Sequence, residues 1–509
     1  MATAERGFLL GIDIGTYESK GMIVSTDGCP VASHAVPHDL LLPRQGWAEH
    51  DAESVWWGDL CTLTKSLLAQ SRMDPKDILA IGCSSIAPDM LPVDDAGLPI
   101  RNAVLYGIDT RAQAEIRELE DRIGERTIFD RTGNALSAQS VGPKILWLAR
   151  NEPEVYRRAR RFVTGTTFLV GRLTGRWVVD HYTASCMGPL YDPSKGAWAE
   201  DLCSGIVETN RLPEIAWTAQ IVGGVTREAA RTTGLAEGTP VIAGTADAAA
   251  EALSVGVVAP SRAMLMYGST MFYIQVTDMP LRDPRLWSAP YLFPKTHAVM
   301  GGMATTGALT RWFRDQLARE EGTELEAYAR LAKRAASIPP GAEGLLVLPY
   351  FSGERTPLND PQARGVFFGL TLSHTQEHLY RAVLEGVGHG IRQHLDLLES
   401  LGKPPHRLMA VGGGTKNRPW LQMVSDISGH AQTVPSVTWG AAYGDAFLAG
   451  MGAGLFRDPV EVDQWVEDRE TVCPCPGLKA HYDRYHELYL ELYQRNKGLM
   501  HALSSLARS

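Results

Sequence analysis

The sequence predicts an α/β protein built from two domains. Apolar strands alternate with segments of helical periodicity: a strand over 8–15 is followed by a helix over 52–68 and by another strand over 78–82. A strand that runs into a glycine turn recurs at 240–244 and at 263–268. We interpret this recurrence as a similarity of topology between two halves, because the residues themselves do not repeat.

The length of the chain supports the same division. A chain of 509 residues exceeds one hydrophobic core of ordinary size, since domains commonly hold roughly 100–200 residues. We expect a boundary near residue 255, after the alanine-rich segment 248–252, and therefore domains over 1–255 and 256–509. Tyrosine, leucine and charged residues recur at helical spacing over 481–506 and predict a closing C-terminal helix.

Composition excludes several classes of protein. Apolar residues make up 44% and charged residues 21% of the chain, as in globular proteins. The net charge of −9 argues against a nucleic-acid surface, which needs clustered lysine and arginine. The sequence has no run of eighteen apolar residues and no secretory signal, so we expect a cytoplasmic protein without a membrane segment. The seven cysteines lack metal-site spacing and are expected to be reduced thiols.

The first chemical motif lies in the hairpin that the strand 8–15 and the segment 20–24 predict. Gly15 permits a sharp turn whose N–H groups can face an anion, and Thr16 adds a hydroxyl donor. Asp13 offers the short carboxylate that Mg²⁺ prefers, and Lys20 offers a point charge for a phosphate. The alternative interpretation is an ordinary hairpin.

A second motif places one acid, Asp247, among small uncharged residues directly after a strand. Desolvation raises the pKa of a carboxylate in such surroundings, which suits a base that takes a proton from a substrate hydroxyl. Aspartate is also a good N-cap, and the alanines from Ala248 onward predict a helix. The motif is therefore compatible with a helix cap as well as with a catalytic base.

Two glycine-containing segments of the second half complete the set of motifs. Gly268 and Ser269 follow a strand and repeat the chemistry of the first turn, so both turns could face one triphosphate. The glycine run 412–414 allows a flat nucleoside to approach the backbone, and Asn417 offers an amide. This run is neither a Walker A motif nor a Gly-x-Gly-x-x-Gly motif. A simple loop remains the alternative.

Taken in order, these motifs resemble the FGGY family of carbohydrate kinases. The most specific evidence is the segment 365–370, Gly-Val-Phe-Phe-Gly-Leu, followed after seven residues by 378–385, His-Leu-Tyr-Arg-Ala-Val-Leu-Glu. The resemblance extends through 45–51, 106–111 and 172–175 and covers residues from about 8 to 450. Within the family the chain is most similar to the xylulose-kinase-like group.

The resemblance implies an actin-like ATPase fold, in which two ribonuclease-H-like α/β domains close over ATP and a sugar in an interdomain cleft. It implies Asp247 as the catalytic base, Asp13 as the Mg²⁺ residue and Asp109 as a substrate residue. The residues that it implies for ATP are Gly15, Thr16, Lys20, Gly268, Ser269, Gly307, Arg311, Gly413 and Asn417. Each of these assignments is carried over for one position of this sequence.

The sequence departs from the xylulose-kinase pattern at the segment 84–89. Those kinases commonly have Gly-Gln-Met-His-Gly after the strand, whereas this chain has Ser-Ser-Ile-Ala-Pro-Asp. We predict that Asp89 replaces the lost sugar contacts, and the alternative is that Asp89 merely starts a turn toward Met90. Ala248 stands where many relatives have a polar residue beside the base. The sequence does not explain the presence of an acidic residue, Glu18, close to the first turn.

The sequence therefore predicts an ATP- and Mg²⁺-dependent kinase for a ketopentose such as xylulose. Its partner is a small sugar or polyol, not a nucleic acid or a membrane, and a homodimer is possible. One alternative is a kinase for ribulose, a tetritol or a non-carbohydrate alcohol. The other is an actin-like ATPase that switches conformation without an acceptor, against which the pattern of 365–385 argues.

Overall fold

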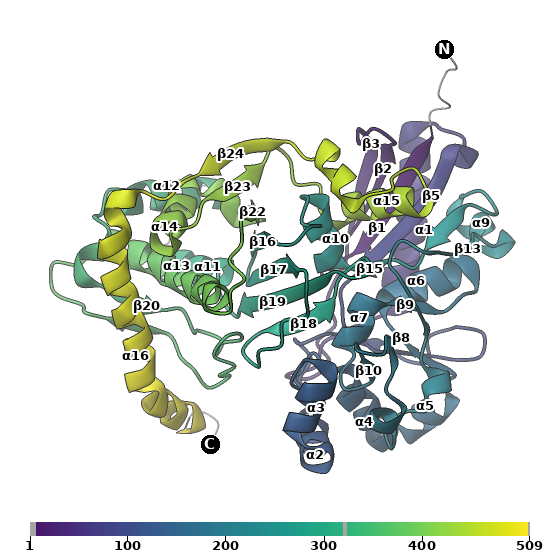
Figure 1. Ribbon diagram of the computed structural model, residues 1–509, viewed down its shortest axis with the longest axis horizontal. Helices are drawn as coiled ribbons and strands as arrows, with labels where there is room; N and C mark the ends of the chain where they lie inside the picture. Colours follow the sequence, from purple (N-terminus) through teal and green to yellow (C-terminus); the bar gives the residue numbers. More distant parts are fainter. Residues whose placement is uncertain (1–6, 319–322, 507–509) are drawn as a thin grey trace. The chain divides into compact units, whose positions relative to one another are not determined.

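The computed structural model describes residues 7–318 and 323–506 and divides them into two compact units (Figure 1). Unit 1 holds the chain up to Ala259 together with 276–298 and 439–466. Unit 2 holds 260–275, 299–438 and the chain from 467 onward. The domain boundary expected near residue 255 stays a prediction.

Unit 1 is organised around a mixed sheet with the strand order β13-β14-β5-β1-β2-β3. β1 pairs antiparallel with β2 and parallel with β5, and the short β15 also pairs with β5. The predicted hairpin and the strand from residue 78 are therefore confirmed. The strands of this sheet are β1 (Phe8–Ile14), β2 (Glu18–Ser25), β3 (Pro30–Pro37), β5 (Ile78–Ser85), β13 (Ile221–Gly224), β14 (Pro240–Ile242) and β15 (Thr245–Ala246).

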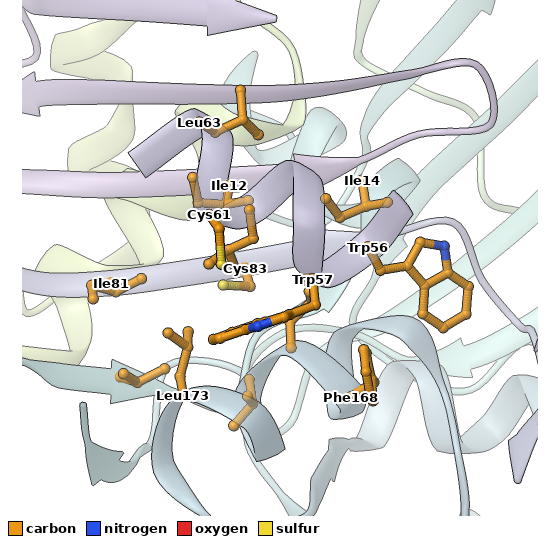
Figure 2. Packing of buried hydrophobic residues seen from close by; sticks show 14 of the residues in the cluster. Ile12, Ile14, Trp56, Trp57, Cys61, Leu63, Ile81, Cys83, Phe168 and Leu173 are labelled. Atoms are coloured by element: carbon orange, nitrogen blue, oxygen red, sulfur yellow. The ribbon is translucent and has the colours of Figure 1, made fainter. Parts of the chain in front are cut away.

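Helices cover both faces of this sheet because its strands are apolar on both sides. The predicted helix from residue 52 exists, but it begins as a π-helical turn, Ala52–Trp57, and continues as α1 (Gly58–Ser71). It packs with α6 (Gly165–Thr174) on the face to which Ile12 and Cys83 point. Figure 2 shows part of this core. α15 (Ala441–Gly452) covers the other face, where Leu9 and Ala80 point.

The remaining elements of unit 1 form a second, largely helical core that includes Met90, Ile145 and Leu212. α10 (Asp247–Ser254) packs on α15 and confirms the helix predicted after Ala248. The other helices are α2 (Gln113–Ile123), α3 (Glu125–Thr132), α4 (Val141–Asn151), α5 (Pro153–Arg158), α7 (His181–Cys186), α8 (Glu200–Cys203) and α9 (Arg227–Thr233). The other strands are β4 (Glu49–His50), β6 (Leu91–Val93), β7 (Ala103–Val104), β8 (Arg161–Val163), β9 (Val178–Asp180), β10 (Tyr191–Asp192), β11 (Ala197–Trp198), β12 (Glu214–Ala216) and β18 (Trp287–Pro290).

Unit 2 contains a second mixed sheet, in which the order β19-β17-β16-β22-β23-β24 is continuous. β16 pairs antiparallel with β17 and parallel with β22, as β1 does with its two neighbours. The two sheets therefore share one strand-pairing pattern, which is the similarity of topology that the sequence predicts for the two halves. The strands are β16 (Arg262–Tyr267), β17 (Met271–Thr277), β19 (His297–Met303), β20 (Leu346–Leu348), β21 (Val366–Phe368), β22 (Arg407–Val411), β23 (Gln432–Pro435) and β24 (Asp468–Val472).

The helices of unit 2 pack mainly on the long helix α13. The predicted C-terminal helix is confirmed as α16 (Figure 1). Its Tyr489 and Tyr493 are buried in a core with residues of β20. The helices are α11 (Gly307–Leu317), α12 (Glu324–Ala336), α13 (Gln376–Ser400), α14 (Arg418–Ser428) and α16 (Lys479–Leu506). In the part of the chain that the structure describes, no helix is long and apolar enough to cross a membrane.

Candidate functional site

Asp247 is the first residue of α10 and follows β15 and the turn at Gly244. Gly244 has a φ of +73°, and a Cβ there would lie 2.2 Å from the carbonyl oxygen of Cys83, so only glycine fits. The Asp247 Oδ1 atom accepts the N–H of the next residue, Ala248, at 2.7 Å, but the N-cap position of α10 is occupied by Ala246, so Asp247 is not the helix cap. Burial, and next the negative charge of Asp13, raise the pKa of Asp247 well above its ordinary value. Asp247 thus touches the helix start and also has the proton affinity that a base requires.

Asp13 lies near the end of β1 and belongs to a buried group of carboxyls. The strand register places it opposite Lys20 on β2 and Ser84 on β5. The Ser84 hydroxyl lies 3.1 Å from Asp13 Oδ1 and 2.6 Å from Asp445 Oδ2. Burial raises the pKa of Asp13 to about 6, although Ser84 and Lys20 oppose the shift. Burial raises the pKa of Asp445 well above its ordinary value, and the charges of Asp13 and Asp247 add to that effect.

Sequence reasoning missed two acids of this group, Asp445 and Glu251. Asp445 is a single acid within α15, whose other residues are small, apolar or aromatic, and it is fully buried. Glu251 lies one turn after Asp247 in α10, and burial raises its pKa to about 7. An acid inside an otherwise apolar helix is the signal that could have identified both.

The turn between β1 and β2 contains the predicted phosphate-binding residues of unit 1. The N–H of Gly15 donates to the carbonyl of Glu18 at 3.1 Å, and the Thr16 hydroxyl lies 3.1 Å from that of Tyr106. Lys20 forms an ion pair with Glu18 at 3.2 Å, which gives Glu18 a structural partner. Both side chains are about half exposed, so exchange of this partner for a phosphate costs little.

Asp89, the last residue of the segment 84–89 that departs from the family pattern, is fully buried. The N–H of Gly165 donates to its Oδ1 atom at 2.9 Å, while Oδ2 has no hydrogen-bond partner among the described residues. Burial raises the pKa of Asp89 to about 7, and the nearby charge of Lys144 opposes the shift. Asp89 also contributes to the raised pKa of Asp247, so the two carboxyls influence each other. A buried oxygen without a partner is costly unless a ligand satisfies it.

Asp109 differs from Asp89 in that protein groups occupy both of its oxygens. Its Oδ2 atom accepts the N–H of Ala48 at 2.7 Å and the guanidinium of Arg111 at 2.7 Å, and Oδ1 accepts Arg111 Nε at 2.9 Å. Arg111 in turn stacks on Trp47, with its guanidinium carbon 4.0 Å from the ring centre. Asp109 therefore holds the segment 106–111 in place through a bidentate ion pair.

In unit 2 the turn after β16 and the start of α11 form one assembly. The carbonyl of Gly268 accepts the N–H of Gly307 at 2.9 Å, and the carbonyl of Ser269 accepts the N–H groups of Thr306 and Ala308, both at 3.0 Å. A Cβ at Gly307 would lie 2.6 Å from the Gly268 carbonyl oxygen, so this approach needs glycine. Two segments that the sequence separates by about 40 residues are thus in direct contact.

The glycine run lies at the end of β22, beside the end of β16. Gly412 has a φ of +88°, and a Cβ at Gly414 would lie 2.7 Å from Tyr267 Cβ, while a Cβ at Gly413 would meet open space. Asn417 caps α14, because its side-chain oxygen accepts the N–H of Trp420 at 3.2 Å. Arg311 is exposed on α11, one turn after Gly307. Because β16 and β22 are parallel, their carboxyl ends bring the two glycine turns to one edge of the sheet.

The residues present fit a magnesium ion that arrives with a nucleotide. Within residues 7–318 and 323–506, no group of three or more histidines, cysteines or acids could hold a metal ion by itself. Mg²⁺ does not require such a group, since it keeps several waters and binds through one or two carboxylates and substrate phosphates. Asp13 supplies a carboxylate beside the predicted phosphate turn.

Comparisons with known proteins agree with this arrangement. The models of the N-terminal and C-terminal domains of the FGGY family of carbohydrate kinases match residues 8–254 and 263–453. A xylulose kinase of Escherichia coli K12 is 31% identical over 498 residues, which are 96% of this chain and 99% of the relative. A gluconokinase of Bacillus licheniformis is 27% identical and covers 95% of each chain. The crystal structure of xylulose kinase from Rhodospirillum rubrum has a TM-score of 0.91 and 32% identity, covering 97% of this chain and 100% of that one.

Fold and comparisons together define a sugar kinase, a phosphotransferase that has the actin-like ATPase fold. The chain belongs to the FGGY family of carbohydrate kinases, whose members use ATP. The predicted fold class and enzyme class are thereby confirmed. The roles of individual residues stay predictions.

Proposed function

We propose that this kinase transfers the γ-phosphoryl group of ATP to a hydroxyl of a neutral ketose or polyol, of which D-xylulose is the leading candidate. The observation that carries the proposal is the pair of carboxyls formed by the partly buried Asp247 and the fully buried Asp89, each of which has a raised pKa. Asp247 accepts the proton of the acceptor hydroxyl as its oxygen attacks the γ-phosphorus and the bond to ADP breaks. Asp89 accepts a hydrogen bond from another hydroxyl and so orients the acceptor.

The proposed roles around ATP follow from the two groups of turns. In unit 1, Thr16 and Lys20 contact phosphate oxygens, Gly15 permits the turn that brings the backbone close to them, and Asp13 holds Mg²⁺, whose charge offsets that of the phosphates when it is bound. The residues of unit 2 that take the rest of the nucleotide are Gly268, Ser269, Gly307, Arg311, Gly413 and Asn417. Asp109 belongs to the acceptor side, where its ion pair with Arg111 supports the position of the segment 106–111.

The charge of the acceptor side supports a neutral substrate over an acidic one. Asp13 and Asp89 already raise the pKa of Asp247 by repulsion between like charges. A sugar acid would bring a further carboxylate to this group, and the interaction of like charges at short range is costly where water is excluded. A ketose or polyol brings only hydroxyl donors. We therefore place gluconate, the substrate in the name of one relative, behind the neutral candidates.

A second candidate substrate class is a ribulose, a tetritol or a non-carbohydrate alcohol. The observation that favours it is the segment 84–89, in which Ser85 bonds to Thr166 at 3.0 Å and Asp89 to Gly165. This segment has neither the imidazole nor the thioether that xylulose kinases commonly present. A switch ATPase without an acceptor is the remaining alternative, and membership of a carbohydrate kinase family argues against it.

A substrate panel tests the proposal. Production of ADP from MgATP is measured with D-xylulose, D-ribulose, erythritol, glycerol and gluconate, each with the Asp247→Asn variant as the control. We expect kcat/KM to be highest for a neutral ketose or polyol and to be at least about tenfold lower for gluconate. A preference for gluconate would contradict the proposed substrate class. Consumption of ATP that does not depend on any acceptor would favour the switch.

A further inference from the structure

Two buried histidines lie against the turn that we propose to bind phosphate. The Nε2 atom of His38 is 3.1 Å from the carbonyl oxygen of Gly15, and the Nε2 atom of His50 is 3.1 Å from that of Thr16. His50 is fully buried, and the side chain of His38 is 6% exposed. The two rings meet edge to face, with centroids 5.1 Å apart. Neither histidine belongs to the proposed set of catalytic and binding residues.

The surroundings of His50 determine which of its nitrogens carries hydrogen. The indole N–H of Trp56, which can only donate, lies 3.1 Å from His50 Nδ1. Nδ1 is therefore the acceptor, and Nε2 carries the hydrogen and donates it to the carbonyl of Thr16. Burial, and next the charge of His38, lower the pKa of His50 to about 4, which keeps this ring neutral at physiological pH.

His38 has hydrogen-bond acceptors at both nitrogens. Its Nδ1 atom is 2.9 Å from Asp59 Oδ2, and the hydroxyl of Ser19 donates to the same oxygen at 2.7 Å. On the other side of the ring, Nε2 faces the carbonyl of Gly15. Because a carbonyl oxygen can only accept, the Nε2 atom of His38 carries hydrogen and donates it to Gly15.

The geometry of the peptide bond links these contacts to the open side of the turn. In a trans peptide, the C=O of one residue and the N–H of the next point in opposite directions. Because the carbonyls of Gly15 and Thr16 point at the imidazoles, the N–H groups of Thr16 and Tyr17 point away from them. Within the described chain these two N–H groups have no hydrogen-bond partner, and Tyr17 is 64% exposed. Successive N–H groups that face one side form a concave site for an anion.

We propose that His38 and His50 are positioning residues for this turn: each holds one carbonyl, so that the N–H groups of Thr16 and Tyr17 face a phosphate of the nucleotide. The inference rests on the proposed function of the turn and adds two residues to it. The histidines contact neither nucleotide nor acceptor. They act on the orientation of two peptide planes, and their removal weakens nucleotide binding selectively.

The test measures the dissociation constant of MgADP by calorimetry and the KM values of MgATP and of the sugar. His50→Leu removes the donor to Thr16 and keeps the volume, whereas His50→Gln restores a side-chain N–H. We expect His50→Leu to raise the dissociation constant of MgADP about tenfold with the sugar KM unchanged, and His50→Gln to recover most of the loss. His34→Leu, on β3 and away from the turn, is the matched control and leaves MgADP binding unchanged.

Further variants make the outcome unambiguous. If His50→Leu does not fold, Trp56→Phe, which removes the donor that fixes the ring, takes its place, and we expect a rise of about threefold. Unchanged MgADP binding in the folded variant, or equal losses for MgADP and sugar, would overturn the inference. Lys20→Met separates this result from the proposed function: if it also leaves MgADP binding unchanged, the turn does not contact phosphate at all. If only Lys20→Met weakens binding, the turn keeps its role and the histidines lose theirs.

Discussion

Asp247 lies near carboxyl groups from three other parts of unit 1. These neighbouring carboxyls are stronger evidence for a functional site than the local sequence motif of Asp247. Asp13 comes from β1, Asp89 follows β5 and Asp445 comes from α15. Burial raises the pKa of each of these three carboxyls, and for Asp445 the negative charges of Asp13 and Asp247 add to the shift. Such a group is unfavourable for the free protein and favourable once a cation and hydroxyl donors bind.

Replacement of Asp247 by asparagine tests the base directly. Asparagine keeps the shape and the contact to the N–H of Ala248 but cannot take a proton. We expect kcat to fall by about 10²–10⁴-fold, the range for loss of a general base, while the dissociation constant of MgADP stays within about twofold. Single-turnover assays and calorimetry measure the two quantities. A variant with normal turnover would rule out Asp247 as the base.

Asp89 is expected to act on the acceptor alone. Asp89→Ala removes the oxygen that lacks a protein partner, and the loss of a hydrogen bond to a charged group costs about 1.5–3 kcal/mol. We therefore predict a rise in the sugar KM of about tenfold or more, with the KM of MgATP unchanged. Initial rates over a grid of both substrates separate the two constants. Equal rises in both KM values would indicate a structural role for Asp89.

At this scale, sequence reasoning found the residues that belong to short motifs and missed those that distant segments contribute. Asp13 lies near the end of β1, Asp89 in the loop after β5, and Asp247 directly after β15, and such positions near strand ends are revealed by local patterns. Asp445 belongs to the same group although it lies almost 200 residues after Asp247 in the sequence. No local sequence pattern predicts such a long-range contact. Their raised pKa values also depend on burial, which a sequence does not give.

At the scale of elements, the packing of α10 on α15 determines where Asp247 lies. A Cβ at Gly444 would lie 2.0 Å from the carbonyl oxygen of Ala250, and one at Gly82 would lie 2.2 Å from that of Asp445. Backbones of two helices and a strand therefore approach each other at glycines. The element that begins with Asp247 cannot move without disturbing this contact.

Gly444→Ala tests the packing of these helices. The added methyl group collides with backbone, which cannot yield as a flexible side chain does, so α10 has to shift. We expect a loss of about 1–3 kcal/mol in the free energy of unfolding and a fall in kcat of about tenfold. Gly498→Ala, in the open interior of α16, is the matched control and should be neutral or slightly stabilising. Urea denaturation and kinetics report the two effects, and equal behaviour of both variants would contradict the prediction.

Elements with strong local patterns were predictable, and their details were not. The hairpin of β1 and β2 follows from two short apolar segments joined by a glycine turn, and the helix α16 follows from helical spacing. The π-helical start of the segment 52–57 carries no comparable signal, because the side-chain periodicity of one turn is too short to distinguish helix types. The return of the segment 439–466 to unit 1 likewise depends on long-range contacts.

At the scale of the whole molecule, each unit repeats one antiparallel and one parallel pairing around its central strand, β1 or β16. Both central strands end in a turn that offers backbone N–H or carbonyl groups and hydroxyls. The sequence was sufficient to predict this correspondence and the fold class, since the order of motifs is that of the FGGY family. It was not sufficient for the acceptor, because the segment 84–89 departs from the common pattern.

The buried carboxyls also predict how the stability of the molecule depends on pH. Asp89 has a pKa of about 7 in the folded protein and of about 4 when unfolded, so between these values the folded state binds more protons than the unfolded state. Its contribution to stability is complete below pH 4 and is lost as the pH rises to 7, at about 1.4 kcal/mol per pH unit.

The variant Asp89→Asn removes this pH-dependent loss of stability. Relative to the wild type, the variant should therefore gain free energy of unfolding from pH 5 to pH 7 and show no further change above pH 8. Urea denaturation at each pH, without nucleotide or Mg²⁺, measures the difference, from which the titration of groups that do not interact with Asp89 cancels. Asp95→Asn, at a side chain that is 93% exposed, is the control and should show no such trend. A constant difference between Asp89→Asn and the wild type would mean that Asp89 is ionised throughout this range, which is the result that would refute the prediction.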